Sequence, residues 1–190
     1  MLATHPGICS GAECPQCFPC LFPSVAAPWE DSRGLAVRTD ATALLPSTTI
    51  IVPHGRHWPE GGPWQVLCHQ RADNGYWGFP GGAQQVGESL AACAVREMEE
   101  ECGILVDILG AVAIDSDPAR GAVCVYPNGT VHYCNVTFLA TWITGKLVCS
   151  EESVTLRWCS TAALPEPFLP THRWRLAQAM AHQGAYIALR

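Results

Sequence analysis

Charged residues are scarce in this 190-residue chain, and basic ones are the scarcest: Lys and Arg number 11 against 17 Asp and Glu, a formal net charge of −6. That balance excludes the clustered basic surface expected of a protein that binds bulk nucleic acid. No apolar run reaches the roughly 18 residues of a membrane span, and no basic segment before an apolar stretch marks a secretory signal. We therefore expect a protein of the cytoplasm that is not associated with a membrane.

The length of the chain allows one sizeable hydrophobic core and is short for two. Residues 1–30 are rich in Pro, Cys and Gly and show little periodicity, which is typical of an extension or linker. We therefore predict a disordered N-terminal extension over residues 1–30 and one folded domain over residues 31–190. No internal repeat is visible in the chain.

Cysteine, in contrast, is abundant, and four of the 11 cysteines fall within the first twenty residues. Cys9, Cys14, Cys17 and Cys20 form a C-x4-C-x2-C-x2-C pattern, and Cys-x2-Cys steps can ligate zinc or an iron–sulfur cluster. Prolines interrupt the pattern, however, and no second ligand pair follows at a zinc-ribbon distance. We therefore favour an unstructured tail over a metal module, and we expect the other seven cysteines to be small buried hydrophobic residues.

A dense run of carboxylates lies in the middle of the chain. Glu97, Glu99, Glu100 and Glu101 occupy four of five consecutive positions. On a helix, Glu97 and Glu101 lie about 40° apart on one face, with Glu100 beside them. Like charges at these spacings destabilise a helix, and a hard divalent cation such as Mg²⁺ or Mn²⁺ would remove that repulsion. The alternative is a solvated acidic face.

The residues around this run favour the metal site over the solvated face. An apolar stripe indicates that the same helix packs on a core, and it consists of Leu90, Ala91, Ala94, Val95, Met98 and Cys102. Glu97 and Glu101 fall at the margin of that stripe. Gly103 is well placed to end the helix in the left-handed conformation. Before the helix, Gly81-Gly82 allows a tight loop whose carbonyls can turn inward.

Residues 82–104 carry a family resemblance. They match the pattern G-x5-E-x7-R-E-U-x-E-E-x-G-U, in which U is a bulky apolar residue. This pattern resembles the Nudix box, and the approach to it through Phe79 and Pro80 is also similar to that of the family. Every specified position is matched, by Gly82, Glu88, Arg96, Glu97, Met98, Glu100, Glu101, Gly103 and Ile104. On this resemblance the chain is identified as a member of the Nudix hydrolase family.

The resemblance implies an α/β fold, a Nudix-like α/β/α sandwich with a mixed β-sheet between helices. The order of strand and helix patterns along the chain agrees with it. Strands are predicted over residues 34–39, 48–53, 65–71, 105–114, 124–126, 131–141 and 155–159, with a hairpin between the fifth and sixth. A closing helix is predicted from Thr171, as its N-cap, to about His182. Its inward face is predicted to be Trp174, Leu176, Ala177 and Met180.

The resemblance also implies the chemistry of a Mg²⁺-dependent hydrolase, with Mn²⁺ as a substitute, that cleaves a phosphoanhydride bond. Glu97, Glu100 and Glu101 are expected to hold the metal, with the Gly82 carbonyl completing its shell. A divalent cation can neutralise phosphate oxygens and acidify the attacking water, and a nearby glutamate can accept the proton. Catalysis is assigned to Glu97 and Glu100, together with Arg96, which is expected to orient a glutamate through a bidentate pair.

Further contributors are expected outside the box. Family members often recruit another carboxylate from a later loop, and Glu152 is preferred for this role over its neighbour Glu151. A nucleobase needs an aromatic platform, and Trp77 and Tyr133 are the preferred residues. The expected partner is a small-molecule nucleotide substrate, a nucleoside diphosphate linked to a further group X. A homodimer is left open.

Two other functions are kept as alternatives. A nucleotide-binding regulatory module on a Nudix fold would sense a nucleotide without cleaving it. Such modules usually lose glutamates of the box, whereas this chain keeps all of them. An isomerase of a prenyl diphosphate on a related fold would need a catalytic cysteine and glutamate, and nothing in the sequence singles out that pair. Hydrolysis is the favoured interpretation.

Overall fold

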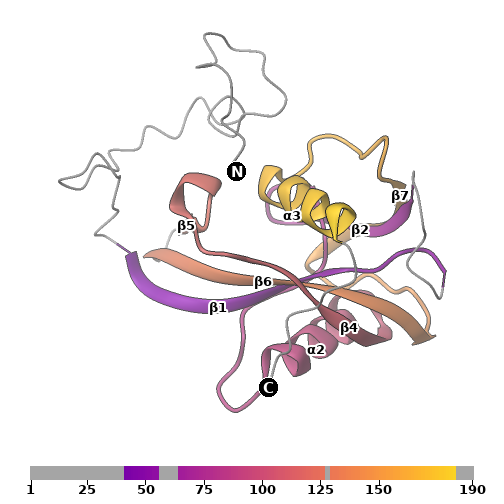
Figure 1. The fold of residues 1–190 in the computed structure, drawn as a ribbon, viewed down its shortest axis with the longest axis horizontal. Helices are drawn as coiled ribbons and strands as arrows, with labels where there is room; N and C mark the ends of the chain where they lie inside the picture. The colour runs from indigo at the N-terminus through magenta and orange to yellow at the C-terminus, as the bar shows by residue number, and fades with distance from the viewer. Residues whose placement is uncertain (1–40, 56–63, 127–128, 183–190) are drawn as a thin grey trace, which may run out of the picture.

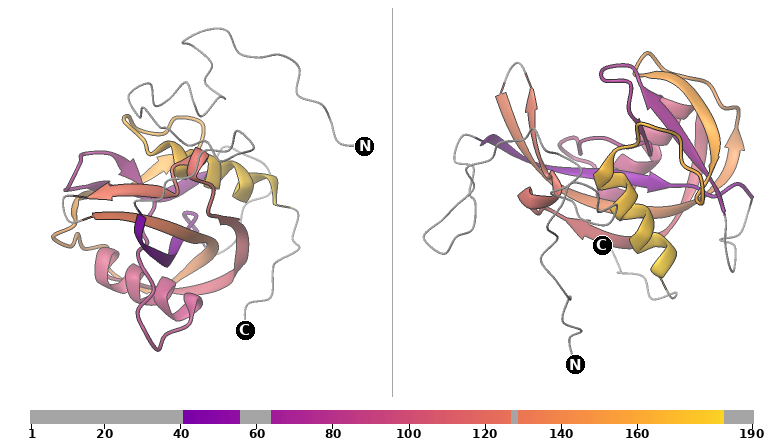
Figure 2. Two further views of the ribbon diagram at one scale, coloured as in Figure 1. Left: turned by 90° about the vertical axis from the view of Figure 1, so that its left-hand side faces the viewer. Right: turned by 90° about the horizontal axis from the view of Figure 1, so that it is seen from above.

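The computed structural model describes residues 41–55, 64–126 and 129–182. The predicted extension over residues 1–30, with Cys9, Cys14, Cys17 and Cys20, lies outside the described residues. So do the start of the predicted domain and the strand predicted over residues 34–39. Within the described ranges the chain forms two β-sheets and two α-helices, whose arrangement is shown in Figures 1 and 2.

The larger sheet consists of β1 (Ala41–Ile51), β4 (Ile104–Asp115), β5 (Val123–Tyr126) and β6 (Gly129–Gly145). Strand β6 lies between β1 and β4, and β5 pairs with one end of it. The sheet is mixed, because β1 is parallel to β6 whereas β4 and β5 are antiparallel to it. The predicted hairpin is confirmed by the register of β5 with β6, in which Tyr126 pairs with Gly129.

The smaller sheet is antiparallel and consists of β2 (Gln65–Arg71), β3 (Trp77–Gly78) and β7 (Ser153–Ser160). Strand β2 is in the middle and has the bounds of the strand predicted over residues 65–71. Strand β3 is absent from the prediction, because two residues are too few to show an alternating pattern. A short 3₁₀ helix, η1 (Pro118–Arg120), follows β4.

The helices α2 (Leu90–Cys102) and α3 (Pro170–Ala181) lie on opposite sides of the larger sheet, as Figure 1 shows. Helix α2 contacts β1 and β4, and α3 contacts β4. The predicted arrangement of a mixed sheet between helices is therefore confirmed, with the smaller sheet added to it. No helix in the described part of the chain combines the length and the apolar character needed to cross a membrane.

The larger sheet separates two hydrophobic cores. Successive side chains of a strand point to opposite faces, so Ile50 packs in the core that contains α2 while Ile51 packs in the core that contains α3. Strand β6 divides in the same way, with Phe138 on the side of α2 and Leu139 on the side of α3. Each helix therefore closes one core against one face of the sheet.

Both ends of helix α2 are capped, and it ends at Gly103 as predicted. The side chain of Ser89, the N-cap, accepts a backbone hydrogen bond from the first turn at 3.1 Å. After the last turn, Gly103 has a φ of 71° and donates its N–H to that turn at 3.0 Å. Ala94, Met98 and Cys102 are fully buried, which confirms the predicted stripe. The stripe holds the carboxylates of α2 at the edge of the core.

Helix α3 does not start as predicted. It begins at Pro170 and has Leu169 at the N-cap, without a side-chain hydrogen bond. Thr171 therefore lies inside the helix and does not cap it. The proline explains the difference, because its fixed φ suits the first helical position and its missing N–H needs no cap there.

The buried face of α3 also differs from the prediction. Leu176 is buried as predicted, but three residues predicted to point inward are exposed or only half-buried, namely Trp174, Ala177 and Met180. Two polar side chains take the inward positions. His172 accepts a hydrogen bond from the backbone N–H of Phe79 at 2.8 Å, and Arg175 donates one to the hydroxyl of Thr49 at 2.9 Å. The polar partners on the sheet side decide which face of α3 is buried.

Candidate active site

The loop before α2 is bound along the edge of β1. The N–H of Ile50 donates to the carbonyl of Pro80 at 2.9 Å, and the N–H of Thr48 donates to the carbonyl of Gly82 at 2.8 Å. These bonds satisfy backbone groups that an edge strand would otherwise leave unpaired. The loop is therefore held in a defined position beside the carboxylates of α2.

Gly82 stands so close to α2 that no side chain fits there. A Cβ atom at this position would lie 2.5 Å from Oε1 of Glu97. The Gly82 carbonyl accepts the N–H of Thr48, and the thiol of Cys93 lies 3.9 Å away. Two of the predicted metal ligands, Gly82 and Glu97, are thus brought together.

Arg96 binds three carboxylates at once. Its Nε and Nη2 donate to Glu88 at 3.0 and 2.7 Å, while Nη1 donates to Glu97 at 2.7 Å and to Glu100 at 2.9 Å. Nη2 also donates to the carbonyl of Ala83 at 3.2 Å. The bidentate pair with Arg96 lowers the pKa of Glu88 to about 2, and the same pair raises the pKa of Arg96. The guanidinium is therefore engaged by the glutamates and the loop.

Glu101 is the most buried carboxylate of α2, with 6% of the residue exposed. One of its oxygens accepts a hydrogen bond from the N–H of Gly81 at 3.0 Å. Burial raises the pKa of Glu101 to about 7, and the negative charges of Glu97 and Glu152 add to the effect. Near neutral pH this carboxyl can therefore take up or release a proton.

Glu152 lies near the carboxylates of α2, although it is far from them in the sequence. It is exposed in the turn before β7, and its carbonyl accepts a hydrogen bond from the turn after β2 at 2.9 Å. Burial raises the pKa of Glu97 against the opposing effect of Arg96, and the charge of Glu152 raises it further. The structure therefore places Glu152 within electrostatic range of both Glu97 and Glu101.

The donors gathered here suit a hard divalent cation. Carboxylate and carbonyl oxygens are the ligands that Mg²⁺ and Mn²⁺ prefer, and a cation would offset the burial and mutual repulsion that raise the pKa values of Glu97 and Glu101. Arg96 binds one oxygen each of Glu97 and Glu100. In the described ranges no three His, Cys, Asp or Glu side chains converge as a ready-made metal site. The second oxygen of Glu97 and of Glu100 is not bonded to Arg96.

The two predicted aromatic platforms have different surroundings. Trp77 is buried in the core that contains α3, and the guanidinium of Arg157 covers its ring at 4.5 Å from the centroid. Tyr133 is half-buried on β6, and its hydroxyl lies 3.1 Å from that of Tyr126 on β5. The tyrosine pair therefore offers a more accessible aromatic surface than Trp77.

Arg71 is a charged residue of this region that the motif does not include. It ends β2, and the next residue, Ala72, donates its N–H to the carbonyl of Glu152. Burial raises the pKa of Glu101, and the positive charge of Arg71 acts in the opposite direction. The only signal in the sequence was an arginine at the end of an apolar strand, which does not by itself indicate a site.

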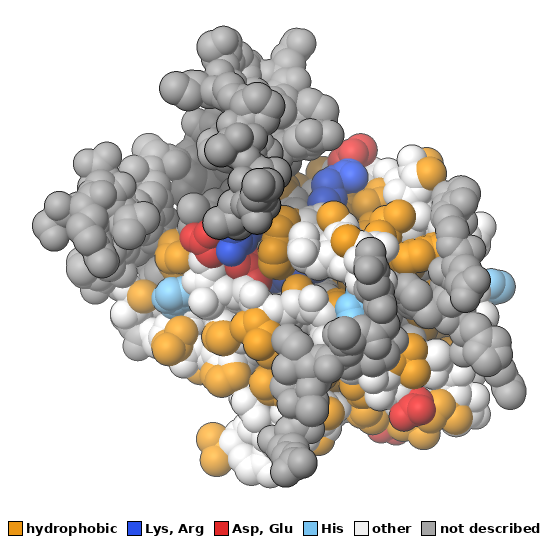
Figure 3. Space-filling model, in the orientation of Figure 1, with side chains coloured by type: hydrophobic (Ala, Val, Ile, Leu, Met, Phe, Trp, Pro, Cys, Tyr) orange, Lys and Arg blue, Asp and Glu red, His pale blue; other side chains and the backbone are white. Residues whose placement is uncertain are grey.

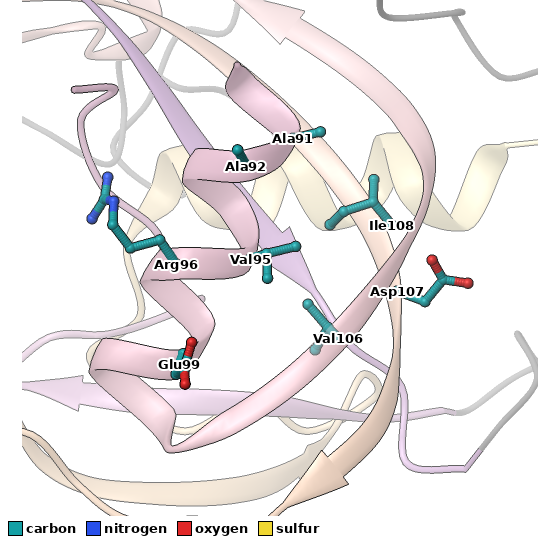
Figure 4. Close-up of a pocket in the computed structure, with 8 residues that line it drawn as sticks. All are labelled: Ala91, Ala92, Val95, Arg96, Glu99, Val106, Asp107 and Ile108. Carbon is teal, nitrogen blue, oxygen red and sulfur yellow. The ribbon is translucent and has the colours of Figure 1, made fainter. Parts of the chain in front are cut away.

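A depression of about 480 Å³ lies between α2 and β4, and Figure 4 shows the residues that line it. Val95, Val106 and Ile108 lie on facing sides of it, and the guanidinium of Arg96 is directed away from them. Glu99 lines the depression, whereas the glutamates predicted to bind metal do not. The depression therefore adjoins the carboxylate site at Arg96 but does not contain the predicted metal ligands.

Basic side chains are sparse on the face of the molecule that Figure 3 shows, and those that are visible adjoin acidic ones. Ion pairs of the described residues agree with this view, as Arg120 binds Asp117 at 3.0 Å and Arg173 binds Glu166. The described residues visible on that face form no continuous basic surface of the kind that binds nucleic acid.

A family model described as the NUDIX domain matches residues 52–182, more than half of the chain. The chain belongs to the Nudix family. The resemblance drawn from residues 82–104 is thereby confirmed, and the loop, the glutamates of α2 and Arg96 together form the Nudix box of this protein.

Comparison with known proteins agrees with this assignment. A MutT-like protein of Streptomyces ambofaciens is 26% identical over 127 residues, 65% of this chain and 73% of the relative. A Mycobacterium tuberculosis protein named as a candidate 8-oxo-dGTP diphosphatase is 31% identical over 120 residues, 60% of this chain and 51% of the relative. The Nudix chain thus spans about half the length of the second relative.

A solved structure shows the same fold. The ADP-ribose pyrophosphatase of Streptococcus suis aligns with a TM-score of 0.54 and 21% identity, over 75% of this chain and 96% of that one. At this level of identity the likeness shows the fold alone. The predicted Nudix α/β/α sandwich is therefore confirmed by comparison as well as by the topology of the sheets.

Proposed function

We propose that this Nudix protein is a Mg²⁺-dependent hydrolase, with Mn²⁺ as a substitute, that cleaves a phosphoanhydride bond in a nucleoside diphosphate linked to a further group X. The proposal rests on one observation, that glutamates of the box contact the loop formed by Gly81 and Gly82. Glu97 packs against the backbone of Gly82, and Glu101 accepts the N–H of Gly81. The names of two similar proteins, an 8-oxo-dGTP diphosphatase candidate and an ADP-ribose pyrophosphatase, support the substrate class.

The proposed ligands of the cation are Glu97, Glu100, Glu101 and the Gly82 carbonyl. A cation bound there would neutralise phosphate oxygens of the substrate and lower the pKa of the attacking water. Arg96 fixes the surrounding carboxylates, because it bonds to Glu88, Glu97 and Glu100 together. Its proposed role is to orient these groups, and Glu152 is proposed as an additional carboxylate of the same site.

The proton of the attacking water needs an acceptor, which we assign to Glu97 or Glu100. Burial raises the pKa of Glu97, and a carboxylate whose pKa is closer to neutrality is a better base. Direct attack by water is favoured over a covalent route, because burial raises the pKa of Cys93, the thiol beside Gly82, to about 11. A thiol that stays protonated is a poor nucleophile.

The nucleobase is assigned to the tyrosines rather than to Trp77. Tyr133 is half-buried and Tyr126 is exposed, and their hydroxyls are in contact, whereas Trp77 is covered by Arg157.

We also propose a cytoplasmic location. The cysteines of the described residues are all free thiols, as is usual in a reducing compartment.

A panel of nucleoside diphosphate derivatives, incubated with Mg²⁺, with Mn²⁺ and with EDTA, tests the proposal through the identity of the products. Metal-dependent release of a nucleoside monophosphate from ADP-ribose or a dinucleotide is the expected result. Activity on phosphomonoesters alone, or on no phosphoanhydride of the panel, contradicts it. Tight nucleotide binding without any product would instead support the alternative, a nucleotide-binding regulatory module on the Nudix fold.

A further inference from the structure

Two cysteines of the smaller sheet are neighbours in the core that contains α3. Cys68 is on β2 and Cys159 is on the adjacent antiparallel strand β7. In the register of these strands Cys68 is opposite Arg157, and Cys159 is opposite Val66. Because alternate residues of a strand share a face, the two cysteines are diagonal neighbours on the same face of the smaller sheet.

The side chains shorten the distance between the two strands. A diagonal pair of an antiparallel sheet is more widely spaced than a directly opposite pair, so the thiols meet only when they lean toward each other. The sulfur of Cys68 lies 3.6 Å from the carbonyl oxygen of Val66, the residue opposite Cys159. The sulfur of Cys159 lies 3.6 Å from the carbonyl oxygen of Arg157, the residue opposite Cys68. Each thiol therefore points along its strand toward the other, and a side-chain hydrogen bond joins them.

The two sulfurs differ in their ease of ionisation. The hydrogen bond with Cys68 lowers the pKa of Cys159 against the effect of burial, and the guanidinium of Arg157 lowers it further. The same hydrogen bond, together with burial, raises the pKa of Cys68. Cys159 is therefore the sulfur that forms a thiolate, the nucleophilic form of cysteine, while Cys68 stays a thiol.

Buried cysteines elsewhere in the described part of the chain have a different environment. In Cys93 and in Cys102, burial is the largest effect on the thiol, and it raises the pKa of both. A buried thiol that stays protonated reacts slowly with oxidants. Cys102 is as fully buried as Cys68, so the two residues allow a comparison in which burial is the same and the neighbours differ.

We propose that Cys68 and Cys159 form a reversible redox pair, in which a peroxide oxidises the two thiols to a disulfide that joins β2 to β7. The Cys159 sulfur attacks the peroxide, whose O–O bond breaks, and it becomes a sulfenic acid as the first water leaves. The Cys68 sulfur then attacks the sulfenic sulfur, the S–O bond breaks, and the second water leaves. Two thiols and one hydrogen peroxide thus give one disulfide and two waters, and the peroxide accepts the two electrons that the sulfurs lose.

The position of β7 allows this reaction. It is at an edge of the smaller sheet, where a strand can shift toward its neighbour to reach disulfide geometry. Cys159 retains 4% of its surface exposed, and hydrogen peroxide is little larger than water. The free thiols of the structure are then the reduced form of the pair.

The disulfide would stabilise the domain without using any group of the carboxylate site. It would close a long loop that contains α2, β4, β5 and β6, and long loops give the largest loss of unfolded-state entropy. Both cysteines are in the core on the α3 side of the larger sheet, whereas the glutamates are on α2. The inference therefore goes beyond the proposed function and does not depend on it.

Peptide mapping of the full-length chain tests the inference. The reduced protein is treated with increasing hydrogen peroxide, blocked with N-ethylmaleimide under denaturing conditions, and digested with trypsin without reductant. Cleavage after arginine leaves Cys68 and Cys159 as the single cysteines of residues 57–71 and 158–173. We expect these two peptides to become linked at the lowest effective peroxide dose and to separate after dithiothreitol. The melting temperature of the oxidised protein should rise by roughly 5 °C or more.

Cys102 is the matched internal control, and its peptide should carry N-ethylmaleimide at the dose that links Cys68 to Cys159. Alanine variants separate the roles of the two sulfurs. In Cys159→Ala the thiol of Cys68 should stay reduced, whereas in Cys68→Ala the sulfenic acid of Cys159 has no resolving thiol and should proceed to sulfinic acid. The map of the wild type needs neither variant to fold.

Three results would overturn the inference. The first is a wild-type Cys159 that ends as sulfinic acid without a link to Cys68. The second is a Cys159 that stays free at doses that oxidise Cys102. The third is a linked pair whose formation leaves the melting temperature unchanged or lower, which would show that the bond forms only in unfolded chains. None of these measurements requires turnover, so they stand apart from the substrate panel.

Discussion

The two helices of this Nudix domain differ in the surroundings of their polar side chains. On α2, Arg96 and its glutamates stand at the margin of an apolar stripe, and they bond mainly to one another. On α3, His172 and Arg175 are buried and bond to the backbone and side chains of the sheets. The ion pairs of α2 are therefore within reach of solvent, whereas the buried polar side chains of α3 fix that helix to the fold.

The surroundings of the two arginines explain the contrast. Arg175 is buried, and burial lowers its pKa to about 10 against the opposing charge of Asp115. Arg96 remains partly exposed, and its bond to Glu88 raises its pKa. A buried charge without a partner is costly, so Arg175 has to keep its contact with Thr49, whereas solvent can replace the contacts of Arg96.

The largest effect is expected for the box glutamates of α2. Glu100→Gln or Glu101→Gln keeps the shape of the side chain but removes a negative ligand, so metal affinity and turnover should fall together. A loss of one to three orders of magnitude corresponds to roughly 1.4 to 4 kcal/mol of transition-state stabilisation. Steady-state assays over a range of Mg²⁺ concentrations measure it, and thermal unfolding without metal should show an intact fold.

Glu99→Gln is the control for this experiment, because Glu99 is on the same helix but lines the depression beside β4 instead of the carboxylate site. We expect nearly unchanged turnover for it. Wild-type rates for the Glu100 and Glu101 double variant, or full activity in EDTA, would remove the metal hypothesis.

The second prediction concerns α3. Arg175→Leu should destabilise the protein by about 2 to 4 kcal/mol, because it removes the bond to Thr49 and leaves the buried charge of Asp115 less compensated. Arg173→Leu, two positions away and partly exposed, should cost less than about 0.5 kcal/mol. Denaturant unfolding compares the two variants. An equal loss of unfolding free energy in the two variants would show that the burial of Arg175 does not make it more important for stability than the partly exposed Arg173.

The elements with strong local signals were predicted well. Helix α2 has its stripe and its terminal glycine within a short segment, and β2 is bounded by turn residues. Strand β1 was predicted over residues 48–53 but begins at Ala41, because its first half, which contains Pro46, is paired with β6 in parallel. That pairing joins segments far apart in the chain and leaves no mark on local periodicity.

The same distinction between local signals and long-range packing applies to the residues of the candidate site. The spacing of Glu97, Glu100 and Glu101 was enough to predict that these carboxylates gather, since a helix of known period brings them to one side. The positions of Glu152 and Arg71 depend on the packing of the turn after β2 against the turn before β7, where the N–H of Ala72 donates to the carbonyl of Glu152. The role of Glu152 remains a proposal, and sequence spacing alone could not place either residue.

The third prediction is a pH effect that belongs to α2. Burial raises the pKa of Glu101 from its ordinary value of 4.5 to about 7. A carboxyl group whose pKa is higher in the folded than in the unfolded chain stabilises the fold at a pH where it is protonated in both the folded and the unfolded chain. This contribution is lost as the pH rises from about 4.5 to about 7. Without metal we therefore expect the free energy of unfolding to fall by roughly 1 to 3 kcal/mol over that range.

Glu101→Gln should flatten this pH dependence, because an amide does not titrate, and adding Mg²⁺ to the wild type should recover stability above pH 7, where the ionised carboxylate can bind the cation. Denaturant unfolding at several pH values in EDTA provides the measurement. An unchanged pH profile in Glu101→Gln would assign the effect to other groups.

The smallest expected effect compares the starts of the two helices. Ser89 accepts a hydrogen bond from the first turn of α2, so Ser89→Ala should cost about 1 kcal/mol of stability. Thr171, which the sequence predicted to cap α3, lies inside that helix behind Pro170, so Thr171→Ala should change stability by less than about 0.5 kcal/mol. Thermal unfolding of the two alanine variants decides the point. A larger loss of stability for Thr171→Ala than for Ser89→Ala would mean that Thr171 caps α3, and that both helices begin with a side-chain cap.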